Sequence, residues 1–299
     1  MSTSTDTVKP GTVPLLNPIL AQETEDHLYH FGILRSAVDL PKMFGDVKFV
    51  CCGGSPTRLA LYAQLFAKDM GIQLGKNLSN SDRYVLYKTG PVLWVNHGMG
   101  APSLSIMLVE IIKLLHYAQA TNVTFFRLGT SGGLGVPPGT VLISSGAVNG
   151  EMEEYHVQYI MGKKTLRPTV LDQGLKDDLF KLAKELNLPV DSGKTLCADD
   201  FYEGQARLDG AFCEYTMKDK FAFLEKLYAK GIRNIEMEST CFSAMTHRAG
   251  IKAAIVCVTL LNRMKGDQVQ IDKSEYVEFE TRPFKLITTY IKRQIAANQ

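Results

Sequence analysis

The sequence predicts an α/β fold with a largely buried mixed or parallel sheet, and three observations lead to this prediction. Short, nearly continuous apolar runs recur along the chain, amphipathic helical patterns lie between many of them, and 299 residues with 45% hydrophobic content suffice for one large core. No internal repeat occurs, and no linker-like composition follows residue 25. We therefore expect a flexible tail over 1–25 and a single domain over 26–299.

Six strands and three helices are expected in order. The strands are runs rich in β-branched and other apolar residues, and they cover 47–52, 91–98, 122–129, 140–147, 232–238 and 251–260. The helices are amphipathic; the first opens with a proline and the others end near Asn or Gly, and they cover 102–119, 174–187 and 219–231. Alternation of these elements is typical of a sheet covered by helices.

The composition and net charge favour a cytoplasmic protein that acts on small molecules. The net charge is +2 with acids and bases nearly balanced, so no electrostatic footprint for nucleic acid or an anionic membrane is present. Neither the phosphate-cradling G-x-x-x-x-G-K-[ST] loop nor the dinucleotide G-x-G-x-x-G occurs, which disfavours ATP and NAD chemistry. The six cysteines form no C-x-x-C pair, several lie in apolar runs, and no secretory signal or membrane span is recognisable.

Polar clusters follow four of the expected strands. They read "CCGGSPTR", "RLGTSGG", "IEMES" and "TLLNR". Ligands of open α/β sheets bind beyond the carboxyl ends of the strands, so we expect the four clusters to converge on one pocket.

Two of these clusters suit an oxyanion such as phosphate. In "GGSPTR", Gly54 permits close backbone approach, Pro56 can start a helix, and Arg58 lies just inside that helix. The alternative is an ordinary turn with Arg58 on a solvated face. Arg127 ends a strand that should be buried and is followed by Thr130, so its charge calls either for an anionic ligand or for a structural salt bridge.

Carboxylates and histidines offer a second set of candidates. Glu236 and Glu238 share one strand face and could act as acid and base or accept the two hydroxyls of a ribose diol. Alternatively, Glu238 could simply cap the following helix. His97 follows a strand and is interpreted as a satisfied core residue. The histidines show no metal-ligand spacing, so we expect no metal site.

The stretch "ADDFYEGQARLDG" carries Gln205 and Arg207 two positions apart in a segment without an apolar run. In an extended segment both side chains would point the same way and present donor, acceptor and donor in that order. That order complements the O2, N3–H and O4 edge of uracil. The alternative is a polar loop in which Arg207 pairs with Asp209 or a backbone carbonyl.

Taken together, these motifs resemble the nucleoside phosphorylases of the uridine type. The resemblance runs from about residue 26 to the C-terminus through "GGSPTR", "HGMGAPSLSI", "RLGTSGGLGVPPGTVLIS", "DFYEGQARLDGAFCEYT", "IRNIEMES" and "VCVTLLNR", and it is nearest to animal-type uridine phosphorylases. It implies a three-layer α/β/α nucleoside phosphorylase fold and a homodimer with shared active sites. It also implies a pentosyltransferase that cleaves uridine with inorganic phosphate to uracil and ribose 1-phosphate, without a cofactor or metal.

The resemblance assigns residues by position. It implies phosphate contacts from Gly54, Arg58, Arg127, Thr130 and, across the dimer, Arg83. It implies ribose contacts from Met237, Glu238 and, across the dimer, His30. It implies a base pocket of Phe201, Gln205, Arg207, Leu260 and Leu261, with catalysis carried by Arg58, Arg127, Gln205 and Arg207.

Three alternatives stay open. A nucleosidase of the same fold would use water in place of phosphate, and it would not need three arginines. A purine-specific relative would carry a Ser-Asp pair near the stretch where this chain reads "TLLNR". A catalytically silent nucleoside-binding paralogue could keep the binding residues after its chemistry was lost.

Overall fold

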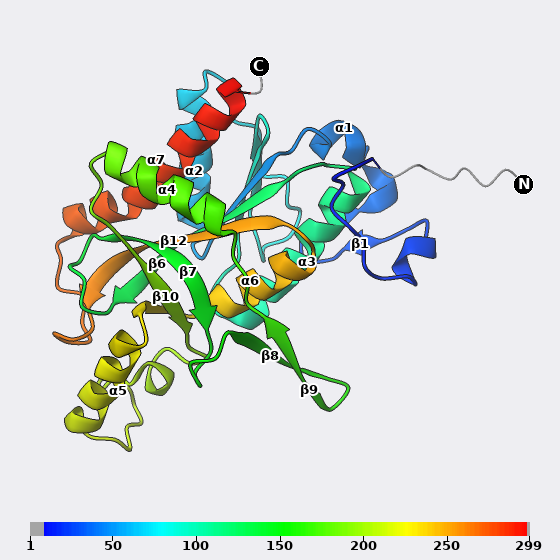
Figure 1. Ribbon diagram of the computed structural model, residues 1–299. Coiled ribbons are helices and arrows are strands. Elements are labelled where there is room, and N and C mark those ends of the chain that lie inside the picture. The colour runs from blue at the N-terminus through cyan, green and yellow to red at the C-terminus, as the bar shows by residue number, and fades with distance from the viewer. Residues whose placement is uncertain (1–8, 298–299) are drawn as a thin grey trace, which may run out of the picture.

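The computed structural model describes residues 9–297, which form three layers around one twisted sheet (Figure 1). Helices α2 (Pro56–Asp69), α4 (Gln173–Glu185) and α7 (Lys273–Ala297) cover one face. Helices α1 (Leu40–Phe44), α3 (Ala101–Tyr117) and α6 (Ser239–Arg248) cover the other. The three-layer α/β/α prediction is therefore confirmed.

The central sheet is mixed and has eight strands in the order β11-β10-β7-β12-β6-β3-β5-β4 within residues 9–297. These strands are β3 (Phe49–Gly53), β4 (Leu86–Thr89), β5 (Val92–Asn96), β6 (Thr124–Gly133), β7 (Val141–Val148), β10 (Val190–Cys197), β11 (Ile232–Glu236) and β12 (Lys252–Asn262). β5, β3, β6 and β12 are mutually parallel, so their carboxyl ends meet at one edge. β11 also pairs antiparallel with the end of β6, which brings Glu236 close to the "RLGTSGG" cluster.

The remaining elements lie outside the sheet. α5 (Met217–Ala229) packs beside β11, and the two-stranded pair β1 (His27–Leu28) and β2 (Ile33–Leu34) lies near α3. β8 (Tyr155–Ile160) and β9 (Lys163–Pro168) form a hairpin that projects from the body of the molecule (Figure 1). Short 3-10 turns occur at η1 (Leu20–Gln22), η2 (Arg35–Ala37) and η3 (Glu203–Gln205).

All six predicted strands and all three predicted helices are present at about the predicted positions. The sequence pattern missed α1, the β1–β2 pair, β4, β10, the β8–β9 hairpin and α7. The hairpin strands are largely exposed and lack a continuous apolar run, and β10 "VDSGKTLC" is interrupted by polar residues and a glycine. The segment of α7 was not predicted as a helix because it is rich in charged residues and contains an internal proline, Pro283.

The predicted tail needs a correction over part of its length. Residues 1–8 lie outside the described residues, but from residue 9 onward the segment contacts the domain. Val13 is buried, its N–H donates to the carbonyl of Ala120 at 3.3 Å, and its own carbonyl accepts from the His116 ring at 2.8 Å. Burial of one apolar side chain and pairing of its backbone hold this stretch against the loop after α3.

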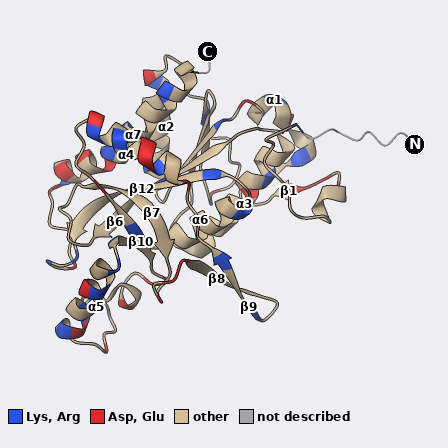
Figure 2. Ribbon diagram, in the orientation of Figure 1, with Lys and Arg blue, Asp and Glu red and all other residues tan. Residues whose placement is uncertain are grey.

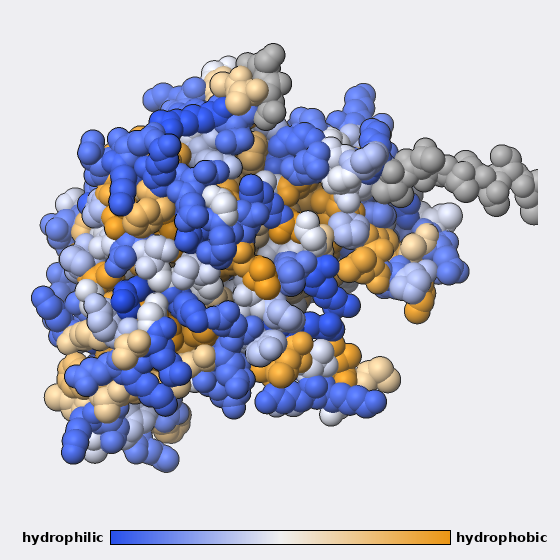
Figure 3. All heavy atoms as spheres, in the orientation of Figure 1, coloured by the Kyte–Doolittle hydropathy of each residue, from blue (hydrophilic) through white to orange (hydrophobic). Residues whose placement is uncertain are grey.

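The surface matches the balanced composition. Basic and acidic residues are interspersed over the ribbon rather than gathered by sign (Figure 2). The face in Figure 3 is mostly hydrophilic, with apolar groups showing near the β8–β9 hairpin, where Tyr159 and Met161 are exposed. Between residues 9 and 297 no helix is both long and apolar enough to span a membrane.

Candidate active site

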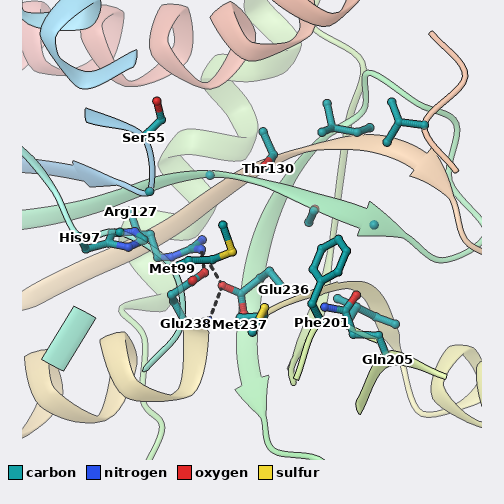
Figure 4. Close-up of a pocket in the computed structure, with 18 of the residues that line it drawn as sticks. Ser55, His97, Met99, Arg127, Thr130, Phe201, Gln205, Glu236, Met237 and Glu238 are labelled. Carbon is teal, nitrogen blue, oxygen red and sulfur yellow. Dashed lines mark hydrogen bonds and ion pairs between the residues drawn. The ribbon is translucent and has the colours of Figure 1, made fainter. Parts of the chain in front are cut away.

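A cavity of about 500 Å³ opens at the edge where the parallel strands end. Its wall comes from the ends of β3, β5, β6, β11 and β12 and from the segment after β10, so the predicted convergence of the polar clusters is observed. Figure 4 shows its layout: Ser55, His97 and Arg127 lie at one end and Phe201 and Gln205 at the other. Glu236, Met237 and Glu238 lie between them.

The first end is built on the start of α2. Ser55 is the N-cap of this helix, and its hydroxyl accepts from the Arg58 N–H at 3.3 Å, while Pro56 occupies the first turn as predicted. The backbone of Gly54 and the side chain of Arg58 both line the cavity. Arg58 does not lie on a solvated face, because its guanidinium forms an ion pair with Glu280 of α7. A helix N-terminus and a guanidinium therefore share one wall.

Arg127 is buried in the cavity wall at the same end. Its guanidinium pairs with Glu236 at 2.8 Å and with Glu238, and it donates to the Cys257 thiol at 3.1 Å. The structural salt bridge that the sequence left open is thus present. Gly129 makes room for it, since a Cβ at that position would lie 2.6 Å from Arg127 Nη1. The glycine in "RLGTSGG" is needed for the arginine two residues before it.

The two carboxylates are held differently. Glu236 accepts from the N–H groups of Glu238 at 3.0 Å and Ser239 at 2.9 Å, so Glu236 rather than Glu238 caps α6 with its side chain. Burial raises the pKa of Glu236, although Arg127 opposes the shift. Burial also acts to raise the pKa of Glu238, but Arg127, His97 and the Gly100 N–H outweigh it and lower that pKa. Glu238 is therefore the carboxylate of the pair that stays ionised to the lower pH.

The far end carries Gln205 and Arg207, but the segment is not extended as predicted. Gln205 ends the η3 turn and Ala206 adopts a left-handed conformation with φ 53° and ψ 39°, which folds the chain back on itself. Both side chains nevertheless line the cavity with Phe201. Arg207 pairs with Asp209 at 2.6 Å and lies 4.5 Å from the Phe201 ring centroid, so the pairing considered for the loop is present.

Arg263 belongs to this end and was missed at the sequence level. It is fully buried and lines the cavity, and its guanidinium donates to Gln205 Oε1 at 3.2 Å and to the Gln205 carbonyl at 2.7 Å. Asp267 balances its charge at 3.0 Å, and Gly132 makes room for its stem, since a Cβ there would lie 2.9 Å from Arg263 Cγ. A charged residue ending the long apolar run "AAIVCVTLLNR" was the available signal.

The other predicted residues divide into two groups. Thr130, Met237, Leu260 and Leu261 all line the cavity. His30 and Arg83 are not among the described residues that line it. His30 contacts Glu110 through its ring Nδ1 at 2.7 Å, and the Arg83 side chain is 72% exposed with Asp82 3.8 Å away. The structure thus brings together the residues predicted to act within one chain.

Comparison with known proteins defines the class of this fold and site. The family model described as "Phosphorylase superfamily" matches residues 48–292, and the chain belongs to this superfamily. Within it, the chain is similar to uridine phosphorylases. It is 60% identical to a "Uridine and thymidine phosphorylase" of Caenorhabditis elegans, over 96% of this chain and 98% of that relative.

Solved structures agree with this assignment. The uridine phosphorylase of Schistosoma mansoni in complex with uracil is 44% identical, with a TM-score of 0.90 over 93% of this chain and 98% of that one. The same enzyme with thymidine gives 0.92 over 95% and 99%. A further relative, "Inactive uridine phosphorylase B" of S. mansoni, is 41% identical over 94% of this chain and 96% of that relative.

Proposed function

We propose that this chain is a uridine phosphorylase, which cleaves uridine reversibly with inorganic phosphate to give uracil and ribose 1-phosphate. One observation carries the proposal: a single cavity presents an anion-binding end, a central pair of carboxylates and a far end with amide and guanidinium groups, in that order (Figure 4). This is the order of phosphate, ribose and base in the reaction. The 60% identity to a uridine and thymidine phosphorylase supports it.

The base end would stabilise the leaving group. Breaking the bond between N1 of the base and C1′ of the ribose leaves negative charge on O2 and O4 of uracil. Gln205 and Arg207 would supply donors to that edge, and the charge of Arg263 behind Gln205 polarises the amide. Donors aimed at charge that develops only during bond breaking stabilise the transition state more than the substrate.

The opposite end would position phosphate. Gly54 N–H, Arg58, Arg127 and Thr130 would hold the dianion below C1′, with Glu238 accepting from the ribose diol and Met237 packing on the sugar. The dianion stabilises the positive charge that grows on the ribose and then forms the new bond at C1′ as the base leaves. No side-chain nucleophile, metal or cofactor is required, and phosphate is a co-substrate.

Uracil release is expected to require phosphate and to be unaffected by a chelator. The measurement is uracil release from uridine in phosphate-free buffer, with and without added phosphate, and with EDTA in a parallel series. Equal rates without phosphate would establish a nucleosidase instead, and no release under any condition would establish a silent nucleoside-binding paralogue. Inosine serves as the purine control, and its faster cleavage would contradict the pyrimidine assignment.

We further propose a cytoplasmic homodimer whose sites are shared. The cavity opens beside Met99, which lines it and is 76% exposed, and further exposed apolar side chains lie nearby on α3 at Ile106 and Val109. The segments that carry His30 and Arg83 pack on the same helix, through Glu110 and through the Tyr84 hydroxyl to the Ser103 carbonyl at 2.8 Å. A two-fold axis here would bring each His30 and Arg83 to the partner's cavity. Free cysteines, five of them buried, support the reducing compartment.

A mixing experiment tests the shared site. Arg83→Ala and Gln205→Leu homodimers should each be strongly impaired, because every site then lacks one contact. After co-refolding of equal amounts, about half of the dimers are mixed and each mixed dimer has one intact site, so about a quarter of wild-type activity should return. Recovery no greater than the mean of the two parents would mean that Arg83 acts within its own chain or not at all.

A further inference from the structure

The imidazole of His97 has no role in the site described above. His97 follows β5, and its backbone N–H donates to the Gly53 carbonyl at 2.8 Å, which fixes it beside the turn that starts α2. The side chain is fully buried, yet neither ring nitrogen has a hydrogen-bond partner within residues 9–297. The interpretation of His97 as a satisfied core residue is therefore wrong.

The unpaired nitrogens lie at the anion-binding end of the cavity. His97 lines the cavity and lies next to Arg127 in Figure 4. A Cβ at Gly54 would come within 3.9 Å of ring atom Cε1, so the ring lies beside the glycine turn. Arg127 Nε is also buried and unpaired in the described chain. Two neighbouring side chains with unused hydrogen-bonding atoms indicate one missing partner, since buried polar atoms are normally paired.

The surroundings keep the ring neutral. Burial, and after it the charge of Arg127, lowers the pKa of His97 to about 4, with Arg58 acting in the same direction and Glu238 and the nearby Gly98 backbone acting against it. A neutral imidazole has one N–H donor and one acceptor nitrogen. A donor without charge suits this end, because both arginines are already balanced: Arg58 by Glu280, and Arg127 by two glutamates.

We propose that His97 is a further phosphate-binding residue, whose ring N–H donates to an oxygen of the phosphate held between Gly54 and Arg127. This inference rests on the proposed function, in which phosphate is the co-substrate. Its neutral N–H would add a hydrogen bond to phosphate without adding a charge to a wall that already holds two arginines and three carboxylates. In the proposed function the ribose would lie next to the phosphate. The experiment therefore separates a contact of His97 with phosphate from a contact with ribose.

His97→Phe and His97→Gln test the proposal, with His116→Phe as the matched control. Phenylalanine keeps the ring and removes both nitrogens, whereas the glutamine amide restores one N–H. His116 lies outside the cavity, where its ring contacts the Val13 carbonyl. The measurements are KM for phosphate, KM for uridine, and the thermal unfolding midpoint of each enzyme with and without inorganic phosphate alone.

For His97→Phe we expect at least a tenfold rise in the phosphate KM and a uridine KM within twofold of wild type. The midpoint without phosphate should not fall, because two unpaired buried nitrogens are replaced by carbon, and the stabilisation by phosphate should be largely lost. His97→Gln should recover part of the phosphate affinity, and His116→Phe should leave both KM values unchanged.

Two results would overturn the proposal: a phosphate KM within threefold of wild type in His97→Phe, or a uridine KM that rises by the same factor, which would assign the ring to the ribose. If His97→Phe does not fold, His97→Leu, which also lacks both nitrogens, is judged by the same two criteria. If the wild-type enzyme releases no uracil, the proposed function fails. The thermal unfolding midpoints with and without phosphate then test the role of His97 separately. Phosphate stabilising wild type but not His97→Phe would still support His97, and no stabilisation of wild type would reject both.

Discussion

Replacing Gln205 with leucine is expected to lower kcat/KM for uridine by at least about 100-fold with the fold retained. Leucine keeps the approximate bulk but turns an apolar side chain toward the polar edge of uracil, which costs about 1–3 kcal/mol per unsatisfied buried group, and more where charge develops. Arg263 would lose one acceptor, but it keeps Asp267 and the backbone carbonyl of residue 205. Steady-state kinetics and the near-ultraviolet circular dichroism spectrum check both parts.

Gln64→Leu is the matched control, because Gln64 is exposed on α2 and lies away from the cavity. Its kinetics should equal those of wild type. Gln205→Glu adds a second comparison, since it keeps an acceptor for Arg263 but removes the amide donors. Near-normal kinetics of Gln205→Leu would mean that the base is recognised by other groups.

Replacing Arg127 with methionine is expected to lower kcat/KM by about 10³-fold or more and also to destabilise the protein. The activity falls because phosphate loses its central charged donor. The stability falls because Glu236 and Glu238 are left buried without their partner, and breaking such a pair costs about 3–5 kcal/mol. Urea unfolding measures the second effect. Arg58→Met is the comparison, because its single partner Glu280 is less deeply buried and the stability loss should be smaller.

The stability deficit of Arg127→Met should depend on pH in a defined direction. Burial already raises the pKa of Glu236 with Arg127 present, and removal of the arginine raises it further above the value of about 4.3 in the unfolded chain. The folded state then binds the proton more tightly than the unfolded state, so the free energy of unfolding falls as pH rises. The deficit should therefore be largest near pH 8 and shrink as the pH falls toward 5. A deficit that is constant over this range would mean that the carboxylates are not the cause.

The sequence predicted the sheet and the strand-end clusters because these depend on local chemistry. Runs such as "KAAIVCVTLL" have the composition of a buried strand, and parallel strands must end at a common edge. The pattern therefore predicted one cavity for Arg58, Arg127 and Glu238.

Other parts depended on contacts between distant segments. The ion pair of Arg58 with Glu280 joins two helices 222 positions apart, and nothing in either local sequence indicates it. The left-handed Ala206 is a conformation that alanine rarely adopts, so the folded loop around Gln205 could not be inferred from its residue types. The orphaned nitrogens of His97 are visible only when every neighbour is placed.

The two ends of the cavity have different origins in the chain. Within one chain, the groups assigned to phosphate and ribose come from strand ends and the start of α2. Of the groups assigned to the base, Leu260 and Leu261 come from the end of β12, whereas Phe201, Gln205 and Arg207 come from one excursion between β10 and α5. Substitutions in that excursion are expected to alter nucleobase recognition and leaving-group stabilisation, while the strand ends that would hold phosphate and sugar stay in place. After a gene duplication, nucleobase preference can thus diverge under selection while the groups for phosphate and sugar are inherited unchanged.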